Sequence, residues 1–336
     1  MKRLLVALPA LLALTMWMAV TPAAASASSA SPPPSRWVAV SVATLWVQPD
    51  QARRVDAPAL ANPADPRGWV AGMTVAQKRW LIGRLETQAL YGTRVYLLRT
   101  SGSWSKVAVK GQPTPRNKWG YPGWLPTAQL TDVPPALAPQ HAPRMAIVRR
   151  RAAWLWERSD LTGRLLELSY GTRLAIVAWT ADYAEVVTLD GTHVFVRRSA
   201  VVLRDPAAPW PRLTGARLVT QARKFQRLQF LYGGTSGYGF DCSGFTHTVY
   251  RALGTTIPRD ADAQFARGKR IVSRSALRPG DLVFFRDPSG YVHHVGMYIG
   301  SGRMIHSPGT GQAVRVTSLS SPHYASEFAG GRRYTR

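Results

Sequence analysis

Short apolar runs separated by turn residues dominate the first part of the chain. The first of these runs, from Trp37 to Val47, is rich in Val and Trp, which predicts a strand. Further on, Thr74-Val-Ala-Gln77 is typical of a helix start, because the Thr and Gln side chains can cap each other's backbone amides. Apolar residues then recur at helical spacing as far as Ala89. We therefore expect residues 36–134 to form a small β-barrel with an inserted helix.

A repeat links this part of the chain to the next. The block Tyr-Gly-Thr-Arg begins at Tyr91 and again at Tyr170, an offset of 79 residues, and strand-like segments follow both copies. Self-similarity at a fixed offset indicates a duplicated structural unit. Residues 143–205 are therefore predicted to form a second barrel of the same kind. Pro-rich stretches, including residues 28–35, indicate linkers.

Residues 210–336 show a different pattern, with longer helical segments followed by strands. One helix is expected near Leu213 to Gln229, and another from Cys242 to a stop at Gly254. Several strands follow, the last of them expected over Ala313 to Thr317. This order predicts an α+β domain in which helices pack against an antiparallel sheet.

The first 27 residues carry the pattern of an export signal. Lys2 and Arg3 precede an apolar run from Leu4 to Val20, and small residues suited to cleavage follow, ending at Ala27. The run is too short, and has the wrong flanking residues, for a helix that spans a membrane. We therefore expect an exported mature protein without a transmembrane segment, located in the periplasm, the cell wall or the extracellular space.

The chain is strongly basic, with 43 Lys and Arg residues against 18 Asp and Glu residues and a formal net charge of +25. Neither a run of five basic residues nor a nucleic-acid-binding motif accompanies this charge, so specific binding of nucleic acid is not expected. For an exported protein, an anionic envelope polymer or lipid surface is the more suitable partner. The alternative is that the charge reflects only an Arg-rich composition and solubility.

The only cysteine of the 336 residues, Cys242, follows a Gly-rich loop and precedes a helical pattern. This order places the thiol on the first turn of a helix, where unpaired backbone amides and the helix dipole favour a thiolate. Such a site lowers the pKa of a cysteine from about 8.5 to roughly 3.5–7.5. We therefore expect a nucleophile that reacts near pH 6. The alternative is a buried structural cysteine.

Two histidines downstream can serve such a thiolate as partners. The segment from His293 to His306 contains two short apolar runs joined by Gly-Ser-Gly, which predicts a β-hairpin. If the loop comprises residues 300–302, His294 and His306 lie on one face as diagonal neighbours, whereas a two-residue loop puts them on opposite faces. The first arrangement fits a relay in which His294 activates Cys242 and His306 orients His294.

The order Asp-Cys-Ser-Gly-Phe, His-Val-Gly-Met-Tyr-Ile-Gly and Met-Ile-His resembles the NlpC-type cysteine peptidases, which are papain-like enzymes of bacterial cell walls. The resemblance covers residues 213–336 and implies that Cys242, His294 and His306 are nucleophile, base and orienting residue. It also implies a papain-like fold and a peptidoglycan stem peptide as substrate, cut between γ-D-glutamate and the following diamino acid. The two preceding barrels resemble the bacterial SH3-like domains that commonly accompany this catalytic domain.

Amide hydrolysis would then proceed through a thioacyl enzyme, with the backbone N–H of Cys242 and a neighbouring donor receiving the oxyanion. Either diaminopimelate or lysine fits the diamino position of the substrate. No metal-binding motif is present in the sequence, and no cofactor is expected.

The first barrel and the nucleophile loop look like one branch of this family, which releases L-Ala-γ-D-Glu from stems with a free amino terminus. The resemblance implies that an acid and a tyrosine of the first barrel line the cleft, and these are placed at Glu86 and Tyr121. It further implies that Asp241, Ser243 and Asp260 contact the substrate. The alternative for Glu86 is a solvent-exposed carboxylate on the inserted helix.

Two positions depart from the family pattern. Phe230 stands where a tyrosine is common, so one hydroxyl near the oxyanion is absent, and Ala261 stands where Ser or Thr is common. Loss of one oxyanion donor lowers a rate by about 10² to 10³, which implies a slower enzyme. Two alternatives stay open: a peptidoglycan-binding protein with a degenerate catalytic domain, and the same nucleophile used for acyl transfer or ester cleavage.

Three further histidines are expected to have no catalytic role. His293 alternates to the face opposite His294. His247 lies about 140° round the helix from Cys242 and points away from it. His323 follows the last predicted strand and is expected to face solvent.

Overall fold

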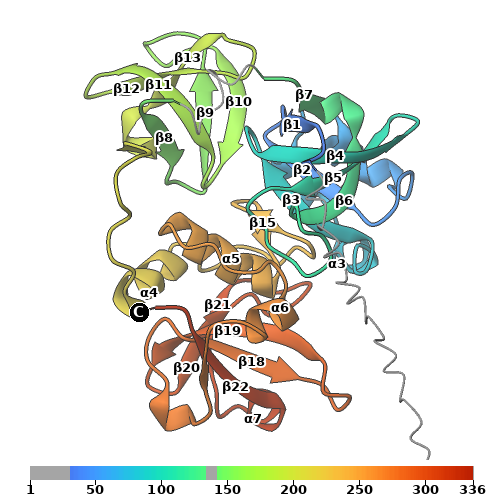
Figure 1. Ribbon diagram of the computed structural model, residues 1–336, viewed down its shortest axis with the longest axis vertical. Coiled ribbons are helices and arrows are strands. Elements are labelled where there is room, and N and C mark those ends of the chain that lie inside the picture. Colours follow the sequence, from blue (N-terminus) through green and yellow to red (C-terminus); the bar gives the residue numbers. More distant parts are fainter. Residues whose placement is uncertain (1–30, 134–141, 336) are drawn as a thin grey trace, which may run out of the picture. The chain divides into compact units, whose positions relative to one another are not determined.

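The computed structural model describes residues 31–133 and 142–335 of the chain (Figure 1). The export signal predicted over residues 1–27, and the first part of the linker predicted over residues 28–35, lie outside the described residues. None of the described helices is long and apolar enough to cross a membrane. Within the unit from Pro32 to Arg336, the strands form three large sheets, and each sheet is the centre of one domain.

The first domain is a seven-stranded antiparallel sheet with three short helices inserted between its second and third strands. Its strands pair in the order β3-β2-β6-β5-β4-β1-β7. They are β1 (Ser35–Val38), β2 (Val42–Trp46), β3 (Leu85–Leu90), β4 (Arg94–Ser101), β5 (Trp104–Val109), β6 (Tyr121–Pro126) and β7 (Leu130–Thr131). The inserted helices are α1 (Ala57–Leu60), α2 (Pro66–Gly72) and α3 (Val75–Trp80). The apolar run from Trp37 to Val47 thus forms two strands and not one.

The predicted inserted helix is correct at its start and wrong at its end. Thr74 caps α3 as expected: its Oγ1 accepts from the Gln77 amide at 3.2 Å, and the Gln77 side chain accepts from the Thr74 amide at 2.8 Å. The helix ends at Trp80, and Gly83 then takes a φ of 73°, a conformation that favours glycine. Ala89 lies in β3 instead. The predicted helix is too long because this strand is buried along almost its whole length, so its apolar residues fit the helical period as well as the strand period.

The second domain has the same topology as the first. Its strands pair in the order β10-β9-β13-β12-β11-β8-β14, which is the order of the first sheet with each number raised by seven. They are β8 (Met145–Val148), β9 (Ala152–Trp156), β10 (Arg164–Ser169), β11 (Arg173–Trp179), β12 (Tyr183–Val187), β13 (His193–Arg197) and β14 (Val201–Arg204). Both copies of Tyr-Gly-Thr-Arg form similar turns, in which Gly92 has a φ of 72° and Gly171 a φ of 82°. In neither sheet do the described end strands pair with each other, so the closed barrels that we expected are not seen.

The third domain packs helices against a six-stranded antiparallel sheet, as the pattern of residues 210–336 predicts. The strand order is β17-β22-β18-β19-β20-β21. The strands are β17 (Lys269–Ile271), β18 (Leu282–Arg286), β19 (Val292–Gly300), β20 (Arg303–His306), β21 (Arg315–Ser318) and β22 (Phe328–Arg333), with a separate ribbon of β15 (Thr235–Ser236) and β16 (Gly239–Phe240). The helices are α4 (Gly215–Arg223), α5 (Cys242–Ala252), α6 (Ala261–Phe265) and α7 (Pro322–Glu327). Helix α5 packs on β19, and Phe245, Val249 and Val295 are fully buried in the core.

Both sheet domains hold the Gly-rich loop that leads to Cys242. From the first sheet, Gln88 accepts two hydrogen bonds from Thr235: its Oε1 from the backbone amide at 3.2 Å, and its carbonyl oxygen from the hydroxyl at 3.0 Å. From the second sheet, Ser169 Oγ accepts from the Gly237 amide at 2.9 Å. A Cβ on Gly237 would overlap a backbone carbonyl of the second sheet domain, so only glycine fits there. The position of the predicted nucleophile thus depends on all three domains.

Candidate active site

Cys242 is the first residue of α5, as the sequence predicts, and its side chain is half-buried. The preceding residue, Asp241, caps the helix, because its Oδ1 accepts a hydrogen bond from the Gly244 amide at 2.6 Å. The Cys242 amide lies in the first turn and therefore has no acceptor within the helix. A free backbone donor is thus placed beside the thiol, where an oxyanion formed at the sulfur would need it.

The thiol is neutral in the resting site, contrary to our expectation of a lowered pKa. Burial, and then the charge of Asp241, raises the pKa of Cys242 to about 12, and backbone amides oppose this only in part. The Sγ atom lies 3.9 Å from the His293 carbonyl oxygen, to which a thiol can donate. Among the described residues, this carbonyl and not the His294 ring is the hydrogen-bond partner of Sγ. Loss of water around the sulfur therefore outweighs the helix dipole.

Alkylation of the thiol should follow the raised pKa. We expect the rate of reaction with iodoacetamide to rise about tenfold per pH unit from about pH 6 to pH 9, because only the thiolate reacts. Intact-protein mass measures this rate for Cys242 alone, since the chain has a single cysteine. The urea-unfolded chain is the control, in which the pKa of the Cys242 thiol is expected to be about 8.5. A rate that is already constant above about pH 6 would support the thiolate expected from the sequence and contradict the neutral thiol.

The two predicted histidines meet on one face of the hairpin formed by β19 and β20. Met297 pairs with Ile305, which is the register that the three-residue loop requires, and a bulge adjusts the turn. His294 Nε2 lies 2.8 Å from His306 Nδ1. On the other face, Val295 and Met297 are fully buried. The prediction that both imidazoles share a face is thus confirmed.

A hydroxyl group extends this chain of side chains behind His294. His306 Nε2 lies 2.9 Å from Thr317 Oγ1, on β21. When His306 donates to Thr317 and accepts from His294 Nε2–H, the lone pair of His294 is left on Nδ1, as a base requires. Tyr324 of α7 packs on both imidazoles, with ring centroids 5.8 Å from His294 and 5.2 Å from His306. Burial lowers the pKa of both histidines, that of His306 to about 3, so both are neutral at pH 7.

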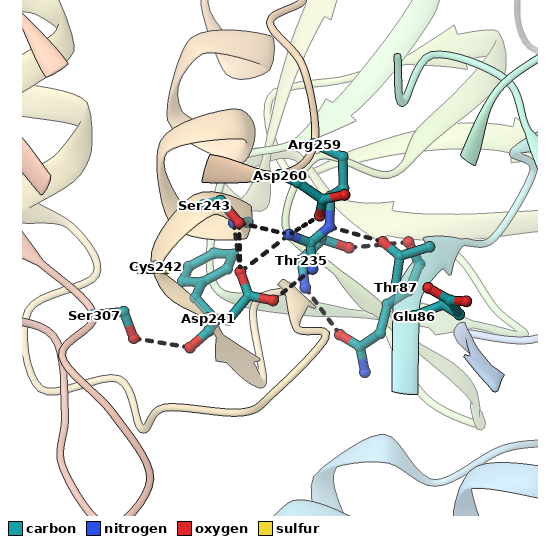
Figure 2. Close-up of polar contacts among 12 residues, drawn as sticks. Glu86, Thr87, Thr235, Asp241, Cys242, Ser243, Arg259, Asp260 and Ser307 are labelled. Carbon is teal, nitrogen blue, oxygen red and sulfur yellow. Dashed lines mark hydrogen bonds and ion pairs between the residues drawn. The ribbon is translucent and has the colours of Figure 1, made fainter. Parts of the chain in front are cut away.

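Arg259 joins the nucleophile loop to the first sheet domain (Figure 2). Its side chain is 1% exposed and donates to both carboxylate oxygens of Asp241, at 3.1 and 2.6 Å. It also donates to Ser243 Oγ at 3.0 Å and to Thr87 Oγ1, in β3, at 3.0 Å. Asp241 and Ser243 therefore direct polar atoms to this guanidinium. Contact of these two residues with a substrate stays a prediction.

The cavity at the thiol has a volume of about 460 Å³. It lies between the first sheet domain and the third domain, and its lining includes every predicted site residue except His306, which is fully buried behind His294. The two positions that depart from the family pattern also line it. These lining residues are Glu86, Tyr121, Phe230, Asp241, Cys242, Ser243, Asp260, Ala261 and His294.

Glu86 and Tyr121 reach this cavity from β3 and β6. Tyr121 is 4% exposed and donates its hydroxyl to Asp260 Oδ2 at 2.8 Å. The Glu86 carboxylate accepts two hydrogen bonds from the Arg116 guanidinium, at 2.5 and 2.6 Å, and Arg116 also donates to the Tyr121 hydroxyl at 3.1 Å. The alternative of a solvent-exposed helix carboxylate is wrong, because Glu86 lies in a strand and its side chain is 10% exposed.

Three other histidines lie outside the relay. His247 is buried on α5, with Nδ1 2.8 Å from the Ile257 carbonyl oxygen, and does not line the cavity. His293 and His323 both pair with Glu327, at 3.1 and 3.3 Å. His323 is exposed as expected, but both residues also line the cavity, which alternation alone did not predict.

Several residues of the site were not identified as such from the sequence: Arg116, Arg259, Thr317 and Tyr324. Arg116 is 30 residues from Glu86 and Thr317 is 11 residues from His306, so no short spacing joins either pair. One feature of the sequence could have identified Arg259 as a site residue: it stands in Pro-Arg-Asp, next to the predicted substrate contact at Asp260.

Known proteins are similar to this chain over most of its length. Residues 227–333 match the model of the NlpC/P60 family. The gamma-D-glutamyl-L-lysine dipeptidyl-peptidase of Bacillus cereus is 40% identical over 302 residues, which cover 89% of this chain and 90% of that protein. The protein of the same name from Bacillus subtilis is 34% identical over 296 residues, which cover 87% of this chain and 96% of that protein.

A solved structure shows the same likeness. The crystal structure of an NlpC/P60 family protein from Bacillus cereus gives a TM-score of 0.85 at 39% sequence identity, and the match covers 90% of this chain and 100% of that chain. The likeness therefore includes the two sheet domains as well as the domain that carries the thiol. Because this similarity extends over nearly the whole chain, and Cys242 and His294 line one cavity, the protein is a cysteine peptidase that belongs to the NlpC/P60 family.

Proposed function

We propose that the protein hydrolyses the γ-D-glutamyl-L-diamino acid bond of peptidoglycan stem peptides, and that it prefers stems with a free N-terminal L-alanine. One observation carries this proposal: the gamma-D-glutamyl-L-lysine dipeptidyl-peptidase of Bacillus cereus is 40% identical over 89% of this chain. With that coverage the similarity includes the first sheet domain, which supplies Glu86, Arg116 and Tyr121 to the cavity.

The proposed reaction proceeds through a thioacyl enzyme. When substrate fills the cavity, His294 Nδ1 takes the proton of the Cys242 thiol, and Sγ attacks the scissile carbonyl carbon. The backbone amide of Cys242 donates to the oxyanion. His294 then gives its proton to the leaving amine, and water hydrolyses the thioester with His294 as base. His306, backed by Thr317, holds the tautomer of His294 throughout.

Acidic side chains are concentrated in the cavity at the thiol. Of the 18 acidic residues in the chain, Glu86, Asp241, Asp260 and Asp262 all line this one cavity. Asp241 pairs with the buried guanidinium of Arg259 at 2.6 Å. Asp260 lies 3.9 Å from the same guanidinium and accepts a hydrogen bond from the Tyr121 hydroxyl. A half-enclosed acidic wall of this kind attracts a cation more strongly than an open surface does. We therefore assign the stem's α-ammonium to the side of the cavity formed by Glu86 and Tyr121.

Arg116 occupies this place in the free protein. Its side chain is 46% exposed, against 10% for Glu86, so the guanidinium can move into solvent while the carboxylate stays in the wall. The ammonium would take over charge-assisted hydrogen bonds that Arg116 gives up, so the exchange leaves the carboxylate paired throughout. The substrate ammonium thus replaces Arg116 at Glu86 in our proposal.

Replacing Glu86 by Gln should lower kcat/KM on free-amine stems by roughly 10- to 150-fold, because a charge-assisted hydrogen bond contributes about 1.5 to 3 kcal/mol. N-acetylation of the stem should lower kcat/KM of the wild-type protein at least as much, since it removes the charge and adds bulk. The two changes together should lose much less than the product of the single losses, because they remove the same interaction. Digestion of defined stems, with products measured by mass, gives all four rates.

Arg116→Gln is the matched control for the Glu86→Gln variant. It removes the resting partner of Glu86 and leaves the carboxylate in place, so the KM for free-amine stems should stay constant or fall, and the preference over acetylated stems should be kept. The opposite result would be that the wild-type protein cleaves acetylated stems, or stems joined to glycan, as fast as free ones. That result would contradict the proposed recognition of the free amine and would identify the protein as a general cell-wall endopeptidase.

We also propose that the protein acts in the cell envelope after export and that its two sheet domains are SH3-like domains with open sheets. Export is supported by the leader pattern of residues 1–27, and envelope association by the net charge of +25, whose attraction to anionic polymers fades with salt. The SH3-like assignment is supported by the duplicated order of short antiparallel strands in the two sheets.

A further inference from the structure

A second cavity, of about 300 Å³, lies where β8 and β14 of the second sheet domain face α4 and α5. It shares no lining residue with the cavity at Cys242. A third cavity, of about 370 Å³, adjoins it, and the two have Gly171, Arg173, Trp210 and Arg251 in common. We call these two adjoining cavities the cationic cleft.

Basic side chains line the cationic cleft without acidic ones. The 300 Å³ cavity is lined by Arg149, Arg173, Arg204, Arg217, Lys224 and Arg251 and by no Asp or Glu. The adjoining cavity adds Arg94 and Lys110, again with no acid. Within the described part of the chain, none of these basic residues forms a salt bridge. Residues 1–30, 134–141 and 336, outside that part, contain no Asp or Glu in their sequence.

Arg173 and Arg251 lie at the junction of the two cavities and repel each other. Burial, and then the charge of Arg173, lowers the pKa of Arg251 to about 10, and burial together with Arg204 lowers the pKa of Arg173. A guanidinium has five N–H donors that can serve an anion. In the described structure, neither Arg173 nor Arg251 has a contact that raises its pKa, as the partner of a paired arginine does. Partly buried like charges without a counter-charge destabilise a fold, so this arrangement favours any anion that can enter.

We propose that the cationic cleft binds a phosphate-bearing anion with at least two negative charges, held between Arg173 and Arg251. A carboxylate offers one charge and two oxygens, whereas a phosphate monoester carries about −1.5 to −2 and three acceptor oxygens at pH 7. The forked guanidinium matches this geometry with paired hydrogen bonds. Basic residues continue from Lys224 in one cavity to Lys110 in the other, so the cleft also suits a ligand with more than one phosphate.

The cleft has a further feature of a ligand site. Trp210 forms part of both walls and stacks under the Arg204 guanidinium at 4.0 Å. A pyrophosphate-like small molecule carries at least two negative charges on one group, whereas the phosphodiester chain of an envelope polymer carries one on each successive phosphate. Both supply the required charge, and the experiment below distinguishes them.

Calorimetric titration and thermal unfolding of the full chain test the proposal, with pyrophosphate and glycerol-phosphate oligomers of increasing length as probes. We expect saturable binding and a rise in Tm above that given by NaCl at equal ionic strength, because a ligand that binds only the folded state stabilises it. Affinity that rises with oligomer length identifies a polymer as the ligand, and equal affinity for pyrophosphate identifies a small phosphate compound. If neither probe raises Tm beyond the NaCl control, the proposal is wrong.

Variants locate the binding. Arg173→Gln and Arg251→Gln should each raise the Kd for the bound probe at least about tenfold, which corresponds to about 1.4 kcal/mol. Each should leave the Tm of the free protein unchanged or higher, since it removes repulsion, whereas loss of a purely structural arginine would lower it. Arg251→Lys, which keeps the charge, should retain part of the affinity. Arg197→Gln, at an exposed position on β13, is the control, and an equal loss of affinity in that variant would show a diffuse surface effect and overturn the site.

Discussion

Replacing Cys242 by Ala is expected to abolish the cleavage of stem peptides, with a loss of about 10⁴-fold or more in kcat, and His294→Ala should lose nearly as much. The thiol begins α5 and the imidazole lies on β19, and both line the same cavity. Because nucleophile and base act as a unit, the double variant should be no slower than either single one. Product release from a defined stem, followed by mass, measures these rates.

Milder variants test the order of the relay. His306→Ala should leave more activity than His294→Ala, since His306 acts only through its neighbour at 2.8 Å. Thr317→Val removes one neutral hydrogen bond, worth about 0.5–1.5 kcal/mol, and should lower kcat by roughly tenfold at most. Because His306 is fully buried, His306→Ala should lower Tm, so each rate is measured well below the Tm of the variant. Near-wild-type turnover by Cys242→Ala would refute the assignment of the nucleophile outright.

Features of the site that depend on local spacing could be predicted from the sequence. The start of α5 at Cys242 follows from a Gly-rich loop that ends in Asp241, because a carboxylate at that position can cap the first turn. The shared face of His294 and His306 follows from strand alternation and loop length, because a shift of one residue would move every side chain to the other face. Both features are fixed within a few residues of the chain.

Features that depend on distant segments could not be predicted in this way. Glu86 was placed on a helix because the apolar residues around it fit a helical period, yet β3 is buried on both faces and shows no alternation. Its partner Arg116 reaches it across the first sheet domain. The pKa of Cys242 was predicted from the helix dipole alone, but burial by segments from elsewhere in the chain reverses the direction of the shift.

Arg259→Met is expected to lower the free energy of unfolding by up to about 3 to 5 kcal/mol, because it leaves the largely buried carboxylate of Asp241 without its cation. The change also removes the hydrogen bonds to Ser243 and Thr87, which join the nucleophile loop to the first sheet domain. Asp241 caps the helix that begins with Cys242, so the folded variant should also lose activity. We expect kcat/KM to fall by roughly tenfold or more, because misplacing a catalytic group by about 1 Å can cost about 10²-fold in rate.

Arg333→Met separates the two effects of the Arg259 variant. Arg333 donates to both carboxylate oxygens of Asp281 at 2.7 Å, so it forms a comparable two-bond ion pair in the same domain, but it does not line the cavity at the thiol. Its loss should lower Tm by several degrees and leave kcat/KM of the folded protein unchanged, whereas Arg259→Met should lower both. Calorimetry gives Tm, and kcat/KM is measured well below the Tm of each variant. If both variants lose stability and neither loses kcat/KM, Arg259 stabilises the fold without positioning Cys242, and the guanidinium takes no part in placing the nucleophile.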